Sequence, residues 1–180
     1  MANTIYLLEK ANLFLGDADP TASTHLVLTD LQLPGPSMKT VEHTPGGAIM
    51  GVNFTVDMLD AMEPTFKLAG FDPDHLKQFG VNAPYKKRFT AYGAIRDKRT
   101  GAQVEAKAVI EGRIASITVD GFSPGGDFGH EYAIKEVVAY SLSVGGNEVF
   151  AFDFFASIWR VGGVDQNAET NRILRIPGVA

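Results

Sequence analysis

The clearest pattern along the chain is a strict alternation of apolar and polar residues in the segment that follows residue 101. The even positions are small or apolar: Ala102, Val104, Ala106, Ala108, Ile110 and Ile114. The odd positions that are polar carry Gln103, Glu105, Lys107, Glu111 and Arg113. An alternation with a period of two predicts a β-strand with one buried face and one solvated face.

This strand is expected to be the second arm of a hairpin that spans residues 88–118. The five residues between the arms, Asp97 to Gly101, are mostly polar and end in a glycine. Gly101 can adopt the positive φ angle that closes such a turn. The rest of the chain is expected to be organised around this hairpin.

Further strands are expected on both sides of the hairpin. The segments are residues 13–15, 26–33, 50–58, 66–70, 132–144 and 149–161. The segment 149–161 is apolar on both faces, which predicts one strand covered on both sides.

Residues 39–59 are expected to form a long hairpin that reaches beyond the body of the domain, because its distal half is polar. Residues 72–80 predict one short helix, with Asp72 as the N-cap and Pro73 in the first turn.

These elements predict a single mainly β domain over residues 1–180, an antiparallel sandwich or barrel with one short flanking α-helix. Residues 162–180 are expected to form a polar C-terminal tail. The 19 glycines and regularly spaced turn signals agree with many short strands. A chain of 180 residues is long enough to bury an ordinary hydrophobic core.

Composition narrows the classes of function. The formal net charge is −5 and no basic block is present, which argues against binding to nucleic acid through phosphate neutralisation. The chain has no cysteine, so disulfides, thiolate metal sites and a cysteine nucleophile are excluded. Neither a membrane-spanning run nor a signal peptide is recognised, so the protein is expected to stay in the compartment where it is made.

A search for catalytic or metal-binding residues gives no constellation. Gly121 to Gly125 match the G-x-S-x-G pattern around Ser123. A nucleophile elbow requires a strand before the serine, a helix after it and an N–H on the following residue, and Pro124 lacks that N–H. The four histidines are scattered without metal-ligand spacing. We therefore expect no enzyme activity, no metal and no cofactor.

The order of the motifs resembles the major tail tube protein family of contractile-tailed bacteriophages. The resemblance covers nearly the whole chain and rests on several short runs and on the central hairpin. The runs are residues 8–16, Leu31-Gln32-Leu33-Pro34, Leu68-Ala69-Gly70-Phe71, Ile110-Glu111-Gly112-Arg113 and Trp159-Arg160-Val161-Gly162-Gly163-Val164-Asp165.

This resemblance implies a virion protein that assembles in the host bacterial cytoplasm. Six subunits form a ring, and rings stack into a hollow tube whose lumen conducts DNA. The implied partners are further copies of the chain, the tail sheath, baseplate and tail terminator proteins, and, within the lumen, the tape measure protein and DNA. Ring closure would also pair the exposed strand edges of neighbouring subunits.

The resemblance also assigns roles to particular residues. The tip of the long hairpin is expected to contact the adjacent ring through Thr44, Pro45, Gly46, Gly47, Ala48 and Ile49. The candidate residues of the tail for contacts between subunits are Asp165, Asn167, Glu169, Arg172 and Arg175. The candidate lumen-facing residues are Gln103, Glu105, Lys107, Glu111 and Arg113. For the tip of the hairpin, the alternative is a surface loop without a partner. For the tail it is a frayed terminus, and for the lumen-facing residues it is a face that meets the sheath.

Other functions remain open at this point. A tube from a headless bacteriocin or from a type VI secretion apparatus would have a similar sequence pattern. A small-molecule-binding β-barrel would instead need a monomer that encloses an apolar cavity. A hydrolase that uses Ser123 would react with serine-directed probes.

Overall fold

The computed structural model describes residues 4–16, 23–47, 49–71, 73–80, 86–121, 123–126 and 128–177. The strands are β1 (Tyr6–Leu15), β2 (Leu28–Gln32), β3 (Met38–His43), β4 (Val52–Leu59), β5 (Thr65–Ala69), β6 (Lys87–Asp97), β7 (Gln103–Val119), β8 (Gly129–Val144), β9 (Asn147–Asp153), β10 (Ile158–Val161) and β11 (Val164–Asp165). The helices are α1 (Pro73–Leu76) and α2 (Ala168–Leu174). The fold is mainly β and antiparallel, which confirms the predicted class.

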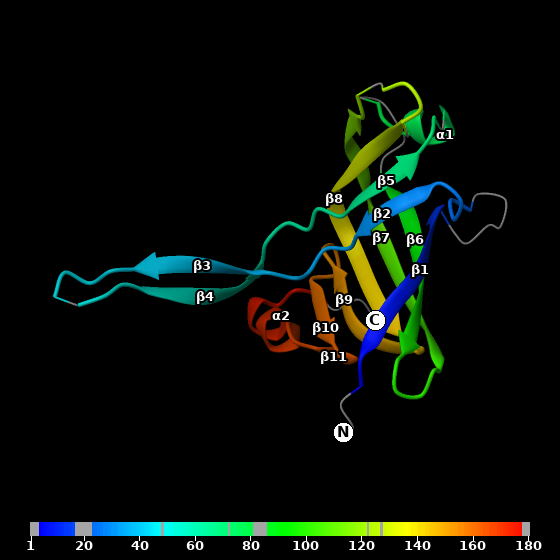
Figure 1. Ribbon diagram of the computed structural model, residues 1–180. Helices are drawn as coiled ribbons and strands as arrows, with labels where there is room; N and C mark the ends of the chain where they lie inside the picture. Colours follow the sequence, from blue (N-terminus) through cyan, green and yellow to red (C-terminus); the bar gives the residue numbers. More distant parts are fainter. Residues whose placement is uncertain are drawn as a thin grey trace.

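One sheet forms the body of the molecule, with the strand order β1-β6-β7-β8-β9-β10-β11 (Figure 1). The predicted central hairpin is confirmed as β6 and β7, which lie between β1 and β8 in this order. Its turn is closed by the N–H of Gly101, which donates to the carbonyl of Asp97 over 2.8 Å. Gly101 has the expected positive φ angle, 76°. The Asp97 carboxylate accepts from Thr4, Thr100 and the Arg99 N–H, and these bonds lower the pKa of Asp97.

Strand β8 bends in its middle and changes partners there. A step of two residues along β7, from Glu111 to Arg113, matches a step of four along β8, from Ala139 to Lys135. Within this bulge Glu136 has a φ angle of 50°, the left-handed region that a non-glycine residue rarely adopts. Beyond the bend, β8 pairs with β5 at one end and with β9 at the other. The bend therefore separates β5 from β9.

The end of the sheet that contains β5 curls into a barrel-like body. β5 pairs with β2, and the segment before β2 returns to β1, where Thr24 donates its hydroxyl to the carbonyl of Leu13 over 2.8 Å. Phe66 and Tyr132 stack inside it with ring centroids 4.8 Å apart. The side chains packed around this pair include Leu13, Leu68, Phe89, Ile110, Ile114 and Ile134, all almost completely buried. Their burial explains the alternation of β7, because Ile110 and Ile114 face this core.

The predicted long hairpin is confirmed as β3 and β4, which form a separate two-stranded sheet. In Figure 1 these two strands project from the body as a narrow ribbon. We call residues 38–59 the arm.

Two expectations for the C-terminal half are wrong. Residues 149–161 form two strands, because the chain turns after Asp153, whose carboxylate accepts the N–H of Ala156 over 2.8 Å. Phe154 and Phe155 lie in this turn and are exposed, so they do not cover a second face of the strand. The polar tail contains a second helix, α2, which ends at Arg175 with a φ angle of 55°. The predicted first helix is confirmed only as the short α1, and Asp72 lies outside the described residues.

Gly112 provides a first test of the packing at the bend. A Cβ atom on Gly112 would lie 2.7 Å from Ile134 Cγ2 and 3.0 Å from the carbonyl oxygen of Lys135. We expect Gly112→Ala to lower the free energy of unfolding by about 1–3 kcal/mol, measured by urea denaturation. Gly35→Ala is the control, since a Cβ there meets no atom within 4 Å. Equal stability of the two variants would contradict the close packing of β7 on β8.

Tyr140 provides a second test. Its hydroxyl is buried without a hydrogen-bond partner among the described residues, and burial raises the pKa of Tyr140 to about 12 from 10.0. The unfolded chain releases this proton near pH 10 and the folded chain holds it to about pH 12, so stability is lost across that interval. Tyr140→Phe should reduce this alkaline loss without lowering stability at neutral pH. The urea midpoint measured as a function of pH reports this alkaline loss of stability. Tyr92→Phe, on the solvated face of the sheet, is the control. Identical alkaline slopes in Tyr140→Phe and the wild type would refute it.

Candidate functional site

The arm carries an apolar face that is exposed in the part of the chain that the structure describes. Val41 is opposite Phe54, and His43 is opposite Val52, so these four side chains share one face of the ribbon. The rings of His43 and Phe54 lie 6.2 Å apart. Val41, Val52 and Phe54 are exposed. The opposite face is polar, with Thr40 opposite Thr55 and Glu42 opposite Asn53.

An isolated two-stranded hairpin is marginally stable in water, because it buries little apolar surface. The tip of the arm adds Ile49 and Met50, both strongly exposed. Thr44, Pro45, Gly46 and Gly47 lie at this tip as predicted, whereas Ala48 lies outside the described residues. A projecting ribbon with one apolar face is suited to contact with another molecule.

A second surface is the polar face of the main sheet. All five candidate lumen residues, Gln103, Glu105, Lys107, Glu111 and Arg113, alternate with the buried positions of β7 and therefore share this face. Neighbouring strands add polar residues to it, because Lys107 is opposite Ser143 in β8, and Glu111 is opposite Arg88 in β6. The structure thus brings the predicted residues together on one surface.

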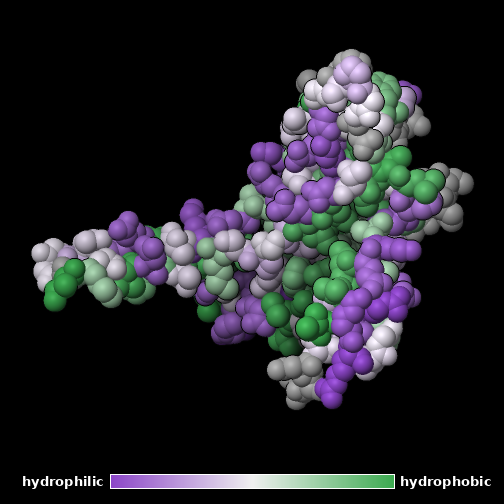
Figure 2. Space-filling model, in the orientation of Figure 1, coloured by the Kyte–Doolittle hydropathy of each residue, from purple (hydrophilic) through white to green (hydrophobic). Residues whose placement is uncertain are grey.

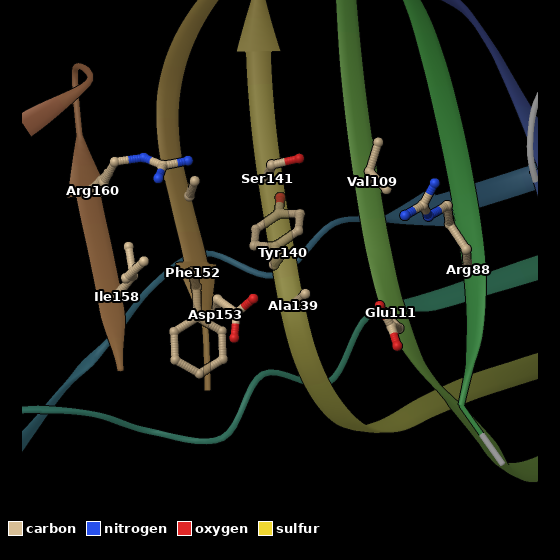
Figure 3. A pocket seen from close by; sticks show the side chains of 11 residues that line it. Arg88, Val109, Glu111, Ala139, Tyr140, Ser141, Phe152, Asp153, Ile158 and Arg160 are labelled. Carbon is tan, nitrogen blue, oxygen red and sulfur yellow. The ribbon is translucent and has the colours of Figure 1, made fainter. Parts of the chain in front are cut away.

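Across this face lies a shallow cavity of about 250 Å³. Its lining residues come from β6, β7, β8, β9 and β10 and include Arg88, Glu111, Ser141, Asp153 and Arg160 (Figure 3). Arg160 donates two hydrogen bonds of 3.1 Å to the Glu148 carboxylate, and this contact raises the pKa of Arg160. The charges of this face therefore include ion pairs within the chain.

Other contacts on the same sheet hold charged side chains in fixed positions. Lys107 Nζ lies 5.5 Å from the centre of the Tyr92 ring. Arg113 donates to the carbonyl of Gly80 over 2.6 Å, which ties β7 to the segment after α1. On β1, hydrogen bonds from Lys98 and then Arg96 lower the pKa of Glu9 to about 2, so this carboxylate remains charged well into the acid range.

The predicted tail residues divide into two groups. Asp165 and Asn167 form hydrogen bonds within the chain. The Asp165 carboxylate accepts the N–H of Asn167 over 3.0 Å, and the Asn167 amide donates to the carbonyl of Ser157 over 3.0 Å. Glu169 and Arg172 form an exposed pair at 2.5 Å. With Arg175, these two are the members available to a partner, and their role between subunits stays a prediction.

The remaining sequence candidates do not assemble into a chemical site. Ser123 lies in an exposed turn between β7 and β8, where the Gly126 N–H donates to the Ser123 carbonyl over 3.1 Å. Within the part of the chain that the structure describes, no cluster of three or more metal-ligating residues occurs. In the same ranges, no helix has the length and apolar character needed to cross a membrane.

Sequence reasoning missed one surface, a groove of about 930 Å³ beside the root of the arm. The arm root, the segment before β5, the bend of β8, strands β9 and β10, and α2 all contribute to its walls. Its apolar residues include Met58, Met62, Val137, Phe152, Trp159 and Val161. Figure 2 shows hydrophobic side chains gathered below the root of the arm. No periodic signal links residues so far apart in the sequence.

The fold is shared with components of an extracellular contractile injection system and with the cap of the anti-feeding prophage. The sheath/tube terminator of the extracellular system PVC, in the extended state, has a TM-score of 0.54 and 12% identity, covering 79% of this chain and 99% of that chain. A chain of the PVC sheath-tube complex has a TM-score of 0.50 and 12% identity, and the match covers 74% of this chain and 88% of that chain. The tube-terminating cap of the anti-feeding prophage has a TM-score of 0.53 and 10% identity, and the match covers 79% of this chain and 93% of that chain.

At the level of sequence, no curated protein matches the chain. A family model does match, and it spans residues 8–174, which includes the central hairpin, the arm and α2. This match agrees with the resemblance seen in the sequence motifs. The chain belongs to the family described as phage tail tube protein FII.

Proposed function

We propose that this chain is the repeating subunit of the inner tail tube of a contractile phage, in which hexameric rings stack around a lumen that conducts DNA. Membership of the tail tube family supports a structural tube subunit. The observation that carries the proposal is the arm, whose apolar face is left uncovered by the described residues of its own chain. In a stack, a subunit of the adjacent ring supplies that cover.

The partners follow from this role. Other copies of the chain form the tube, and the tail sheath surrounds it, with the terminator and the baseplate at its ends. The tape measure protein and then DNA occupy the lumen, which the polar face of β7 lines in our proposal. The protein assembles in the host bacterial cytoplasm and remains in the phage tail.

A tube subunit of a headless contractile particle, either a bacteriocin or an injection system, is the second candidate. The likeness to the sheath-tube complex and terminator of an injection system, and to the tube-terminating cap of the anti-feeding prophage, favours it. A small-molecule-binding barrel is disfavoured, because Phe66 and Tyr132 stack in the middle of the barrel-like body. An enzyme is disfavoured by membership of a structural family.

Deleting residues 44–49 tests the arm. We expect the deletion variant to fold normally and to lose ring stacking, because the tip extends beyond the body and contributes nothing to its core. Negative-stain electron microscopy measures stacking, and urea denaturation measures folding. Ile49→Ser is a milder change with the same expected direction, and Thr44→Ser at the same tip is its control. Tubes of normal length from the deletion variant would show that the tip has another role.

Charge changes on β7 test the lumen. We expect the double variant Gln103→Lys, Glu105→Lys to assemble normally and to retain DNA, because added cations attract phosphate groups in a salt-dependent manner. Binding of a fluorescent DNA to assembled tubes at several salt concentrations measures retention. Thr118→Lys at the far end of β7 is the control. Failure to assemble would place this face in a contact between subunits instead, and unchanged DNA retention would remove it from the lumen.

A further inference from the structure

The groove beside the root of the arm is a surface that no segment among the described residues covers. Its floor contains the apolar residues Met62, Phe152 and Trp159, which come from the segment before β5, from β9 and from β10. Met62 is buried within the core, whereas Trp159 is packed against the core and is partly accessible. The floor is therefore continuous with the hydrophobic core.

The groove exists because β8 bends. Lys135, Glu136 and Val137 form the bend and also line the groove. β5 pairs with one end of β8 and β9 with the other, so the sheet is interrupted between these two strands. Phe152 and Trp159, which are opposite each other in β9 and β10, both line the groove that opens at this interruption.

The walls of the groove are polar and mainly acidic. They include Asp57, Asp60, Glu136 and Asp153, in addition to Glu63, which is paired with Lys135 at 3.1 Å. Gln166, Asn167 and Thr170 line the side that the C-terminal segment provides. An occupant must be apolar where it meets the floor, and it must not bring acidic groups against these walls.

The apolar face of the arm meets both requirements. Val41, Val52 and Phe54 share this face with His43, whereas Glu42, the acidic residue next to Val41 and His43 in the sequence, is on the opposite face. No like-charge contact is therefore introduced when this face enters the groove. The same ribbon has polar groups on its other face, which would remain in water.

The arm of the same chain is not the occupant. Met38 and Met58, at the root of the arm, already form part of the groove wall, and the ribbon projects away from that point (Figure 1). The occupant must come from a second copy. We propose that the groove of each subunit receives the apolar face of the arm of another subunit.

This proposal rests on the proposed function and names the two surfaces that would join copies of the chain. The donor and the acceptor are different surfaces of one chain, so each copy offers both. A contact of this kind is heterologous and continues from copy to copy, unlike a closed two-fold dimer. It is suited to a growing polymer.

The single tryptophan of the chain, Trp159, is a native reporter of the groove. On assembly of the wild-type protein we expect a blue shift of its emission and a loss of quenching by acrylamide, because the arm of another copy excludes water. The variant without residues 44–49 and the variant Phe54→Ser should show a reduced change. Assembly with an unchanged Trp159 spectrum would overturn the proposal.

Cross-linking between introduced cysteines identifies the occupant. The chain has no native cysteine, so only the introduced thiols can react. Val52→Cys places a thiol on the apolar face of the arm, and Thr170→Cys places one on the groove wall. With a short bismaleimide linker, we expect the double variant to give a ladder of covalent multimers on a denaturing gel. Each single variant, and Val52→Cys combined with Thr118→Cys at the far end of β7, should give no ladder.

The outcomes separate this proposal from the proposed function. If tubes form and the Val52/Thr170 pair gives no ladder while Trp159 remains exposed, the groove is not the acceptor and the tube function stands. If the wild-type protein forms neither rings nor tubes at high concentration, both proposals fail. A ladder together with a protected Trp159 supports both.

Discussion

The structure depends on the pairing of β7 with β8 and on the bend that interrupts it. β8 pairs with β7 over most of its length, yet its other edge is shared between β5 and β9. The bulge at Glu136 allows this change of partner, and Gly112 allows the two strands to pack closely beside the bulge. The barrel-like core lies on one side of the bend, and the apolar groove opens at it.

The bend also explains why one chain carries surfaces that remain uncovered. A closed barrel would hide its edges and its interior within the monomer. Here only the end built on β5 and β2 curls round, while β9, β10 and α2 border an open groove. The arm leaves the body next to that groove and carries its own apolar face into solvent. The core of the chain is buried, and the apolar side chains of the arm remain exposed.

Sequence periodicity predicted the parts of this fold that depend on local alternation. Ile110 and Ile114 revealed the buried face of β7, and residues 50–58 revealed the arm. The split of residues 149–161 depends on the turn at Asp153 and Ser157, which an unbroken apolar run conceals. Helix α2 is short and polar, so it has no apolar stripe, although Glu169 near its start and Arg172 near its end are typical helix signals. The groove joins distant segments and could not be predicted from spacing.

In our proposal, the arm and the groove are complementary surfaces of one self-assembling tube subunit. The most direct measurement is a cryo-electron microscopy reconstruction of the purified wild-type protein at high concentration. We expect stacked rings in which density for the ribbon of one subunit lies over Trp159 of another. Rings or tubes whose arms point into solvent, or a solution of monomers alone, would contradict it.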